Sequence, residues 1–158
     1  MIIFKNNSGF TLLELLIAIS ILGVIVAITM PKLVDYRKEQ SLKNTAENIV
    51  SILNKAKSDS LNSLNSLNYG IHFSSNYLDY FIGTTYNPAD INNKRTNFGD
   101  GVTLSPGGLN LNGGGSDIIF PRLIDDIIGY GSITIEITTN PSMNKTITVN
   151  KIGSISSN

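Results

Sequence analysis

The chain has 158 residues, enough for one domain of ordinary size, and its 12 basic and 12 acidic residues cancel. From Gly70 onward five basic residues stand against seven acidic ones, and this acidic balance argues against binding to nucleic acid phosphates. The absence of cysteine excludes disulfides, thiol catalysis and cysteine-ligated zinc.

Residues 10–30 form an apolar run with a single charge, Glu14. As a helix, the run would span roughly 31 Å, which matches a hydrocarbon core of about 30 Å. A secretory signal peptide has a shorter apolar stretch followed by a small-residue cleavage site, and neither is found here. A plain membrane anchor fits the length, but it gives no role to Glu14, whose charge is costly in a bilayer. An anchor with an incidental acid stays open on these grounds.

A more specific signal lies at the start of this run. Ser8-Gly9-Phe10-Thr11-Leu12-Leu13-Glu14 resembles the processing motif of type IV pilins and type II secretion pseudopilins. The resemblance implies that a prepilin peptidase cuts after Gly9 and removes the leader, residues 1–9. It also implies that the new N-terminal residue, Phe10, is N-methylated.

Further positions match the same family pattern, namely Glu14, Gly23, Pro31 and the Asp35-Tyr36 pair. Cleavage would create a charged amine at the membrane edge. The Glu14 of an incoming subunit could pair with that amine on its neighbour, and the pairing would remove the cost of an unpaired ion. We therefore expect Glu14 to act in filament assembly.

Gly23 and Pro31 have a mechanical interpretation. Glycine weakens a helix by about 1 kcal/mol, and proline removes a backbone hydrogen bond. A helix that breaks or melts between them could bend while it packs into a filament. An ordinary membrane-helix kink is the alternative, since both residues are common in such helices.

The resemblance also implies a location. The family keeps its leader inside the cytoplasm, crosses the inner membrane once and places its head outside, before it joins a periplasmic or extracellular filament. The charges do not follow this orientation, because Lys5 precedes the span whereas Lys32, Arg37 and Lys38 follow it. A positive-inside count alone favours the opposite orientation.

Beyond residue 30 the pattern becomes amphipathic, which predicts that a helix over 31–68 continues from the membrane-spanning segment 10–30 into a globular head. One apolar stripe repeats every three or four positions: Leu42, Ala46, Ile49, Val50, Leu53 and Ala56. Three Ser-Leu-Asn triplets follow at 60–68, and Asn68-Tyr69-Gly70 is a stop signal, so we expect the helix to end near Leu67.

Residues 69–158 predict a β-rich head. Alternating or apolar segments predict strands at 69–73, 77–82, 102–104, 109–111, 118–120, 133–137 and 147–149, and the polar stretch 83–101 predicts a surface loop. Alternation is typical of antiparallel sheets with one buried face. The predicted fold is α+β and pilin-like, with a long N-terminal helix packed on an antiparallel head of two small sheets.

The head most resembles those of H-type minor pseudopilins and T-type minor fimbrial pilins, through segments such as Tyr69-Gly70-Ile71-His72-Phe73 and Thr148-Val149-Asn150-Lys151-Ile152-Gly153. Some T-type relatives bind DNA through a C-terminal Gly-Arg-x-Arg. The matching segment here is Gly153-Ser154-Ile155-Ser156, in which serine occupies both arginine positions. This difference also argues against nucleic acid as a partner.

No catalytic constellation is apparent, and we predict no enzyme activity, cofactor or metal. His72 is interpreted as a packed or half-exposed residue, and Gly113-Gly114-Gly115 as a flexible turn without the context of a phosphate loop. Asp125-Asp126 is interpreted as a solvated turn, because no oxygen-rich loop accompanies it as a calcium site would require.

Together these features predict a structural subunit of a type IV pilus or a type II secretion pseudopilus. The head resemblance favours a minor subunit that helps to initiate or tip the filament, in assembly, protein secretion or DNA uptake. The implied partners are prepilin peptidase, other pilin or pseudopilin subunits, the inner-membrane assembly platform, and lipid before assembly. The alternatives are a major pilin and a filament-displayed binding module, either an adhesin or a DNA-capture minor pilin.

Overall fold

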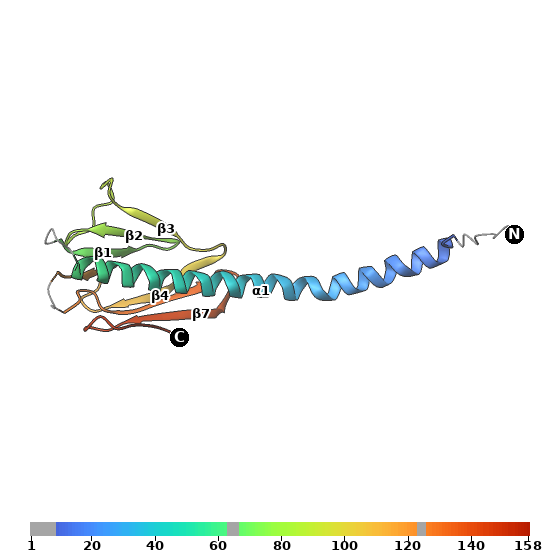
Figure 1. The fold of residues 1–158 in the computed structure, drawn as a ribbon. Coiled ribbons are helices and arrows are strands. Elements are labelled where there is room, and N and C mark those ends of the chain that lie inside the picture. Colours follow the sequence, from blue (N-terminus) through green and yellow to red (C-terminus); the bar gives the residue numbers. More distant parts are fainter. Residues whose placement is uncertain (1–8, 63–66, 123–125) are drawn as a thin grey trace. The chain divides into compact units, whose positions relative to one another are not determined.

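The computed structural model describes residues 9–62, 67–122 and 126–158. One helix, α1 (Leu12–Leu61), precedes a series of strands (Figure 1). The chain divides between Arg37 and Lys38 into two compact units. The long N-terminal helix and the antiparallel strands that follow it confirm the predicted α+β, pilin-like fold.

Helix α1 continues through Gly23 and Pro31, although both residue types weaken helices. It ends at Leu61, so the predicted end near Leu67 was wrong. Leu67 and Asn68 are not helical, and residues 63–66 lie outside the described residues. Serine and asparagine side chains compete with the helix for backbone groups, which explains the earlier end within the Ser-Leu-Asn triplets.

The predicted apolar stripe of α1 is buried in the second unit. Its fully covered members lie three or four residues apart: Leu42, Ala46, Ile49, Leu53 and Ala56. Polar contacts add to this packing, since the Ser60 hydroxyl donates to the carbonyl oxygen of Phe120 and the Tyr80 hydroxyl donates to Asp59. The amphipathic half of α1 is therefore part of the head.

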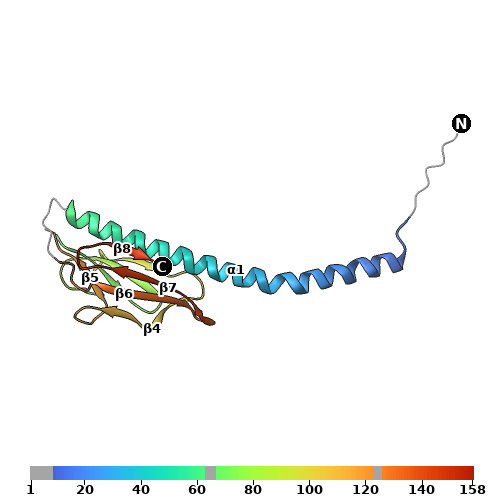
Figure 2. The same ribbon diagram turned by 90° about the horizontal axis from the view of Figure 1, so that it is seen from below.

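The head contains two antiparallel sheets, as predicted. The first sheet has the order β3-β2-β1-β5, with β1 (Tyr69–Phe73), β2 (Tyr77–Ile82), β3 (Lys94–Asn97) and β5 (Asp117–Phe120). The second has the order β4-β6-β7-β8, with β4 (Val102–Leu111), β6 (Gly131–Ile137), β7 (Asn140–Val149) and β8 (Ile155–Ser157). Figure 2 shows the second sheet and β5 beside the C-terminal half of α1.

Residues from α1 and from both sheets share a single core, so the head folds as one unit. Alternate strand residues point into this core, including Ile71 and Phe73 of β1 and Ile133, Ile135 and Ile137 of β6. The hairpin of β1 and β2 and the alternating strands near residues 133–137 and 147–149 are confirmed.

Three details of the head differ from the sequence prediction. Strand β3 lies within the predicted loop 83–101, where its polar residues gave no apolar alternation. The two short strands around Pro106 are one strand, β4, whose register shifts between Leu104 and Leu109. Strand β8 was not predicted, because only three residues at the end of the chain form it.

Candidate functional site

The predicted processing site lies just before α1. Gly9 and Phe10 have no regular secondary structure, and the Phe10 side chain is 81% exposed. A Cβ atom added to Gly9 would meet nothing within 4 Å, and Gly9 does not have a left-handed backbone. Neither packing nor backbone conformation in the described residues therefore requires glycine at this position. A requirement for glycine would have to come from another molecule that recognises it.

Glu14 lies in the first turn of α1, where Thr11 caps the helix. The Thr11 side-chain oxygen accepts a hydrogen bond of 3.2 Å from the backbone N–H of Glu14. Thr11-x-x-Glu14 has the spacing of a capping box, and an acid in the first turn interacts favourably with the helix dipole. This local role of Glu14 was not predicted, although the threonine three residues before the acid is its sequence signal. The cap stabilises the start of α1, but it does not neutralise the charge of Glu14.

The first half of α1 exposes an almost continuous apolar surface. Its exposed large side chains include Leu12, Leu13, Leu15, Leu16, Ile17, Ile19, Ile21, Leu22, Val24, Ile25, Val26, Ile28 and Met30. By length and composition this helix could cross a membrane. An exposed apolar surface of this extent requires lipid or partner helices to cover it.

Two hydroxyl groups within this surface are already hydrogen-bonded. The Ser20 hydroxyl donates to the carbonyl oxygen of Leu16 (2.7 Å), and the Thr29 hydroxyl donates to that of Ile25 (3.0 Å). Such bonds within the helix reduce the cost of placing a hydroxyl in lipid. The charge of Glu14 is thus the one strongly polar feature of the segment 10–30 that the helix itself does not satisfy.

Gly23 and Pro31 both lie within the continuous helix, so no break appears between them in the single chain. A Cβ atom at Gly23 would meet nothing within 4 Å. Glycine at this position is therefore not needed for packing within the chain.

The outer face of the first sheet carries a polar row that crosses all four of its strands. Strand register places Arg95, Asp79, His72 and Asp117 opposite one another in this order, from β3 to β5. Arg95 donates two hydrogen bonds to Asp79, of 2.9 and 2.8 Å, and His72 Nδ1 lies 2.6 Å from Asp117 Oδ1. His72 is half-buried, in agreement with its interpretation as a packed or half-exposed residue.

Tyr86, from the connection between β2 and β3, covers this row. Its ring stacks on His72 with centroids 3.9 Å apart, and its hydroxyl donates to Asp79 at 2.6 Å. Asp79 is 1% exposed as a result. The hydrogen bonds from Arg95 hold the pKa of Asp79 below its ordinary value of 3.8, although burial opposes this shift. Its hydrogen bond to Asp79 raises the pKa of Tyr86.

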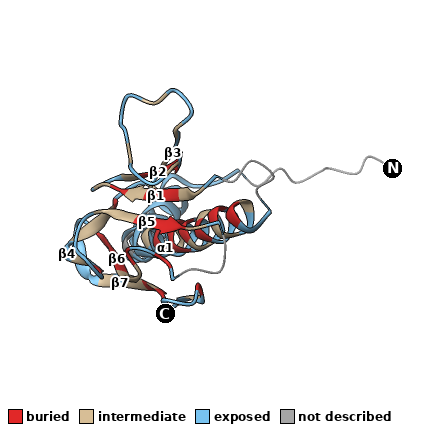
Figure 3. Cartoon of the chain, turned by 90° about the vertical axis from the view of Figure 1, so that its left-hand side faces the viewer, coloured by how far each residue is buried: buried red, intermediate tan, exposed pale blue. Residues whose placement is uncertain are grey.

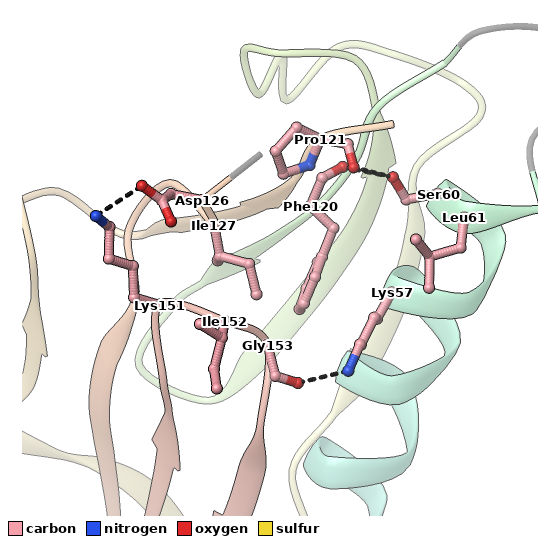
Figure 4. A pocket seen from close by; sticks show the side chains of 10 residues that line it. All are labelled: Lys57, Ser60, Leu61, Phe120, Pro121, Asp126, Ile127, Lys151, Ile152 and Gly153. Atoms are coloured by element: carbon pink, nitrogen blue, oxygen red, sulfur yellow. Dashed lines mark hydrogen bonds and ion pairs between the residues drawn. The ribbon is translucent and has the colours of Figure 1, made fainter. Parts of the chain in front are cut away.

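The head also contains a small apolar pocket beside the end of α1. Figure 4 shows its lining, which consists of Lys57, Ser60, Leu61, Phe120, Pro121, Asp126, Ile127, Lys151, Ile152 and Gly153. Lys57 donates a 2.8 Å hydrogen bond to the carbonyl oxygen of Gly153, and Lys151 pairs with Asp126 at 2.6 Å. Asp126 thus takes part in an ion pair, and Asp125 lies outside the described residues. The described residues contain no cluster of three potential metal ligands.

Comparison with known proteins gives two findings. The family model described as the prokaryotic N-terminal methylation motif matches residues 4–30. A crystal structure of the type IV minor pilin FimU of Pseudomonas aeruginosa (strain PAO1) is similar at a TM-score of 0.54 and 11% identity, over 77% of this chain and 90% of that one. A second crystal form of FimU gives a TM-score of 0.49 at 13% identity, over 74% and 92% of the two chains. No curated protein sequence matches.

Proposed function

We propose that this chain, which has the N-terminal methylation motif and the fold of a type IV pilin, is a minor pilin subunit that helps to initiate or tip a filament. One observation carries the part of this proposal that makes the chain a filament subunit. The methylation motif heads a helix whose first half exposes apolar side chains along its length, while its second half is built into a folded head. Such a helix suits storage in a membrane followed by packing against other subunits.

The proposed sequence of events uses the residues at the front of the chain. Prepilin peptidase cuts after Gly9 and removes residues 1–9, and Phe10 becomes the methylated N-terminus. The apolar segment 10–30 crosses the inner membrane once, with the head outside the cytoplasm. At the assembly platform, Glu14 then pairs with the N-terminal amine of a neighbouring subunit. That pairing neutralises a charge that lipid does not solvate.

Gly23 and Pro31 would allow α1 to bend as it packs. The helix is continuous in the single chain, so the proposed break or melting between these residues would take place during assembly. The acidic balance of the head and the serines at Ser154 and Ser156 count against a DNA-capture role. We propose no catalytic activity, since pilins are structural subunits.

Mass spectrometry of the mature N-terminus tests the premise of processing. We expect a methylated Phe10 as the first residue, and an intact Met1 or cleavage elsewhere would refute the proposal. Gly9→Val is an informative variant, because a side chain at this position meets nothing in the described structure. It should block processing while the head still folds.

Glu14→Val and Glu14→Gln test the assembly step in full-length chains. We expect both to be processed but to be depleted from sheared filaments. Glu47→Gln is the matched control, because Glu47 lies on the same helix and is exposed in a long 3.9 Å pair with Lys43. Filament incorporation of the Glu14 variants at the level of Glu47→Gln would contradict the proposed role. The abundance of the chain in filaments distinguishes a minor from a major subunit.

A further inference from the structure

One apolar side chain projects from the head into solvent. Ile91 is 95% exposed, more than any other large hydrophobic residue in the described part of the chain. It lies in the connection between β2 and β3, which Figure 3 shows as an exposed loop beyond the edge of the sheet. Single exposed apolar side chains are common on protein surfaces. Ile91 is of interest because the loop that carries it is hydrogen-bonded into shape and an apolar pocket lies elsewhere on the head.

The loop that carries Ile91 is held in shape by its own hydrogen bonds. The side chain of Asn87 accepts from the backbone N–H of Ala89 (3.0 Å), and that of Asp90 accepts from the backbone N–H of Asn92 (2.9 Å). The Asn93 side chain donates to the carbonyl oxygen of Asn87 (2.7 Å), and Tyr86 anchors the base of the loop. A side chain presented by an ordered loop loses little conformational entropy when it binds.

The apolar pocket beside α1 has the size of one such side chain. Its volume is about 170 Å³, and an apolar cavity of about 150 Å³ holds a single benzene molecule. Leu61, Phe120, Ile127 and Ile152 supply apolar lining, and Ile152 at the pocket is itself 85% exposed. The pocket therefore suits a branched aliphatic group inserted from outside.

The charges beside the side chain and the pocket are complementary. Asp90 precedes Ile91 and carries a negative charge, whereas Lys57 lines the pocket and carries a positive one. Among the described residues, neither takes part in an ion pair. Lys151 differs, because Asp126 already neutralises it. An incoming Ile91 would thus bring its own acid toward an uncompensated lysine.

From these features we propose that Ile91 of one copy of this chain inserts into the apolar pocket of a second copy, with Asp90 facing Lys57. Its exposure shows that Ile91 does not occupy the pocket of its own chain. In a head-to-tail arrangement of this contact, one copy would retain a free Ile91 and the other a free pocket.

The contact would be weak by itself. A single side chain in a pocket buries far less than the roughly 1,200 Å² of a stable interface. It would act only where copies of the chain are already concentrated, which a shared membrane provides. In this respect the inference rests on the proposed function, since anchoring in the membrane before assembly supplies the concentration.

Cysteine cross-linking tests the contact directly, because the natural chain has no cysteine. Ala89→Cys places a thiol beside Ile91 and leaves the apolar side chain intact, and Ile152→Cys places one at the pocket. Full-length chains of the two variants would be mixed in phospholipid vesicles at high density and oxidised. We expect the mixed disulfide to form several-fold faster than with Ser156→Cys, a matched exposed position outside the pocket. Equal rates for the two pairs would overturn the inference.

Further substitutions in the Ala89→Cys chain distinguish the contact from chance collision. Ile91→Asp should reduce cross-linking to the control rate, and Ile91→Val should retain it. Asp90→Asn keeps the acceptor that orders the loop but removes the charge, and Lys57→Gln removes the other charge. Each should slow cross-linking, and the double variant should be no slower than either single one. Insensitivity to Ile91→Asp would refute the contact.

The vesicle measurement does not require filaments. Failure of cross-linking would therefore leave the proposed filament role intact. Failure of processing or of filament incorporation would refute that role without deciding the head contact.

Discussion

Removal of the Tyr86 hydroxyl should loosen the loop that carries Ile91. In Tyr86→Phe the ring can still stack on His72, but Asp79 loses the 2.6 Å hydrogen bond from the hydroxyl while it keeps both bonds from Arg95. A hydrogen bond to a charged group contributes about 1.5–3 kcal/mol. Because Tyr86 is only half-buried and water can replace it, we expect the lower end of this range. The equilibrium constant for opening of the loop should then increase roughly tenfold.

Hydrogen exchange of the full-length chain measures this opening. The backbone N–H groups of Asp90 and Asn93 donate to carbonyl oxygens within the loop, so their exchange should accelerate about tenfold. The amide of Ile135, in the centre of β6, should not change. Tyr130→Phe is the matched control, since the Tyr130 hydroxyl makes no hydrogen bond to the described residues. Unchanged exchange at Asp90 and Asn93 in Tyr86→Phe would show that the loop orders itself without Tyr86.

Three further predictions concern the stability of the head. Because the pKa of Asp79 in the folded chain lies below its ordinary value of 3.8, the ionised side chain should stabilise the head above that pH. This contribution should be lost as the pH falls through the folded pKa. The Asp79→Asn variant should therefore be less stable at pH 7, and its stability should depend less on pH in acid denaturation. Gly70→Ala should lower the free energy of unfolding of the head by about 1–3 kcal/mol, because the new Cβ would lie 2.2 Å from the Phe81 ring. An unchanged melting temperature would contradict this. Leu53→Ala should lower the free energy of unfolding, measured with denaturant, by about 2–5 kcal/mol, because Leu53 of α1 is fully buried in the core of the head. A loss of less than about 1 kcal/mol would show that the core collapses around the cavity.

Local patterns in the sequence predicted the elements that depend on periodicity. The apolar run 10–30 and the stripe that includes Ile49 and Leu53 predicted α1, because helical spacing alone decides which face is apolar. Alternation at Ile133, Ile135 and Ile137 likewise predicted β6. Strand β3 escaped prediction, because Lys94–Asn97 is polar and is ordered by pairing with β2. A strand that depends on its partner leaves no periodic signal in its own residues.

The front of the chain and its head therefore differ in what the sequence alone could decide. Gly9, Phe10 and Glu14 were found from a short contiguous motif, and the structure added that no packing contact requires glycine at position 9. In the head, only strand register brings Arg95 and Asp117 into one row with Asp79, and only folding places the end of α1 beside Phe120 to form the pocket. Motifs and periodicities are local and survive in the linear sequence, whereas a charge row or a pocket is formed by residues that become neighbours only when the chain folds.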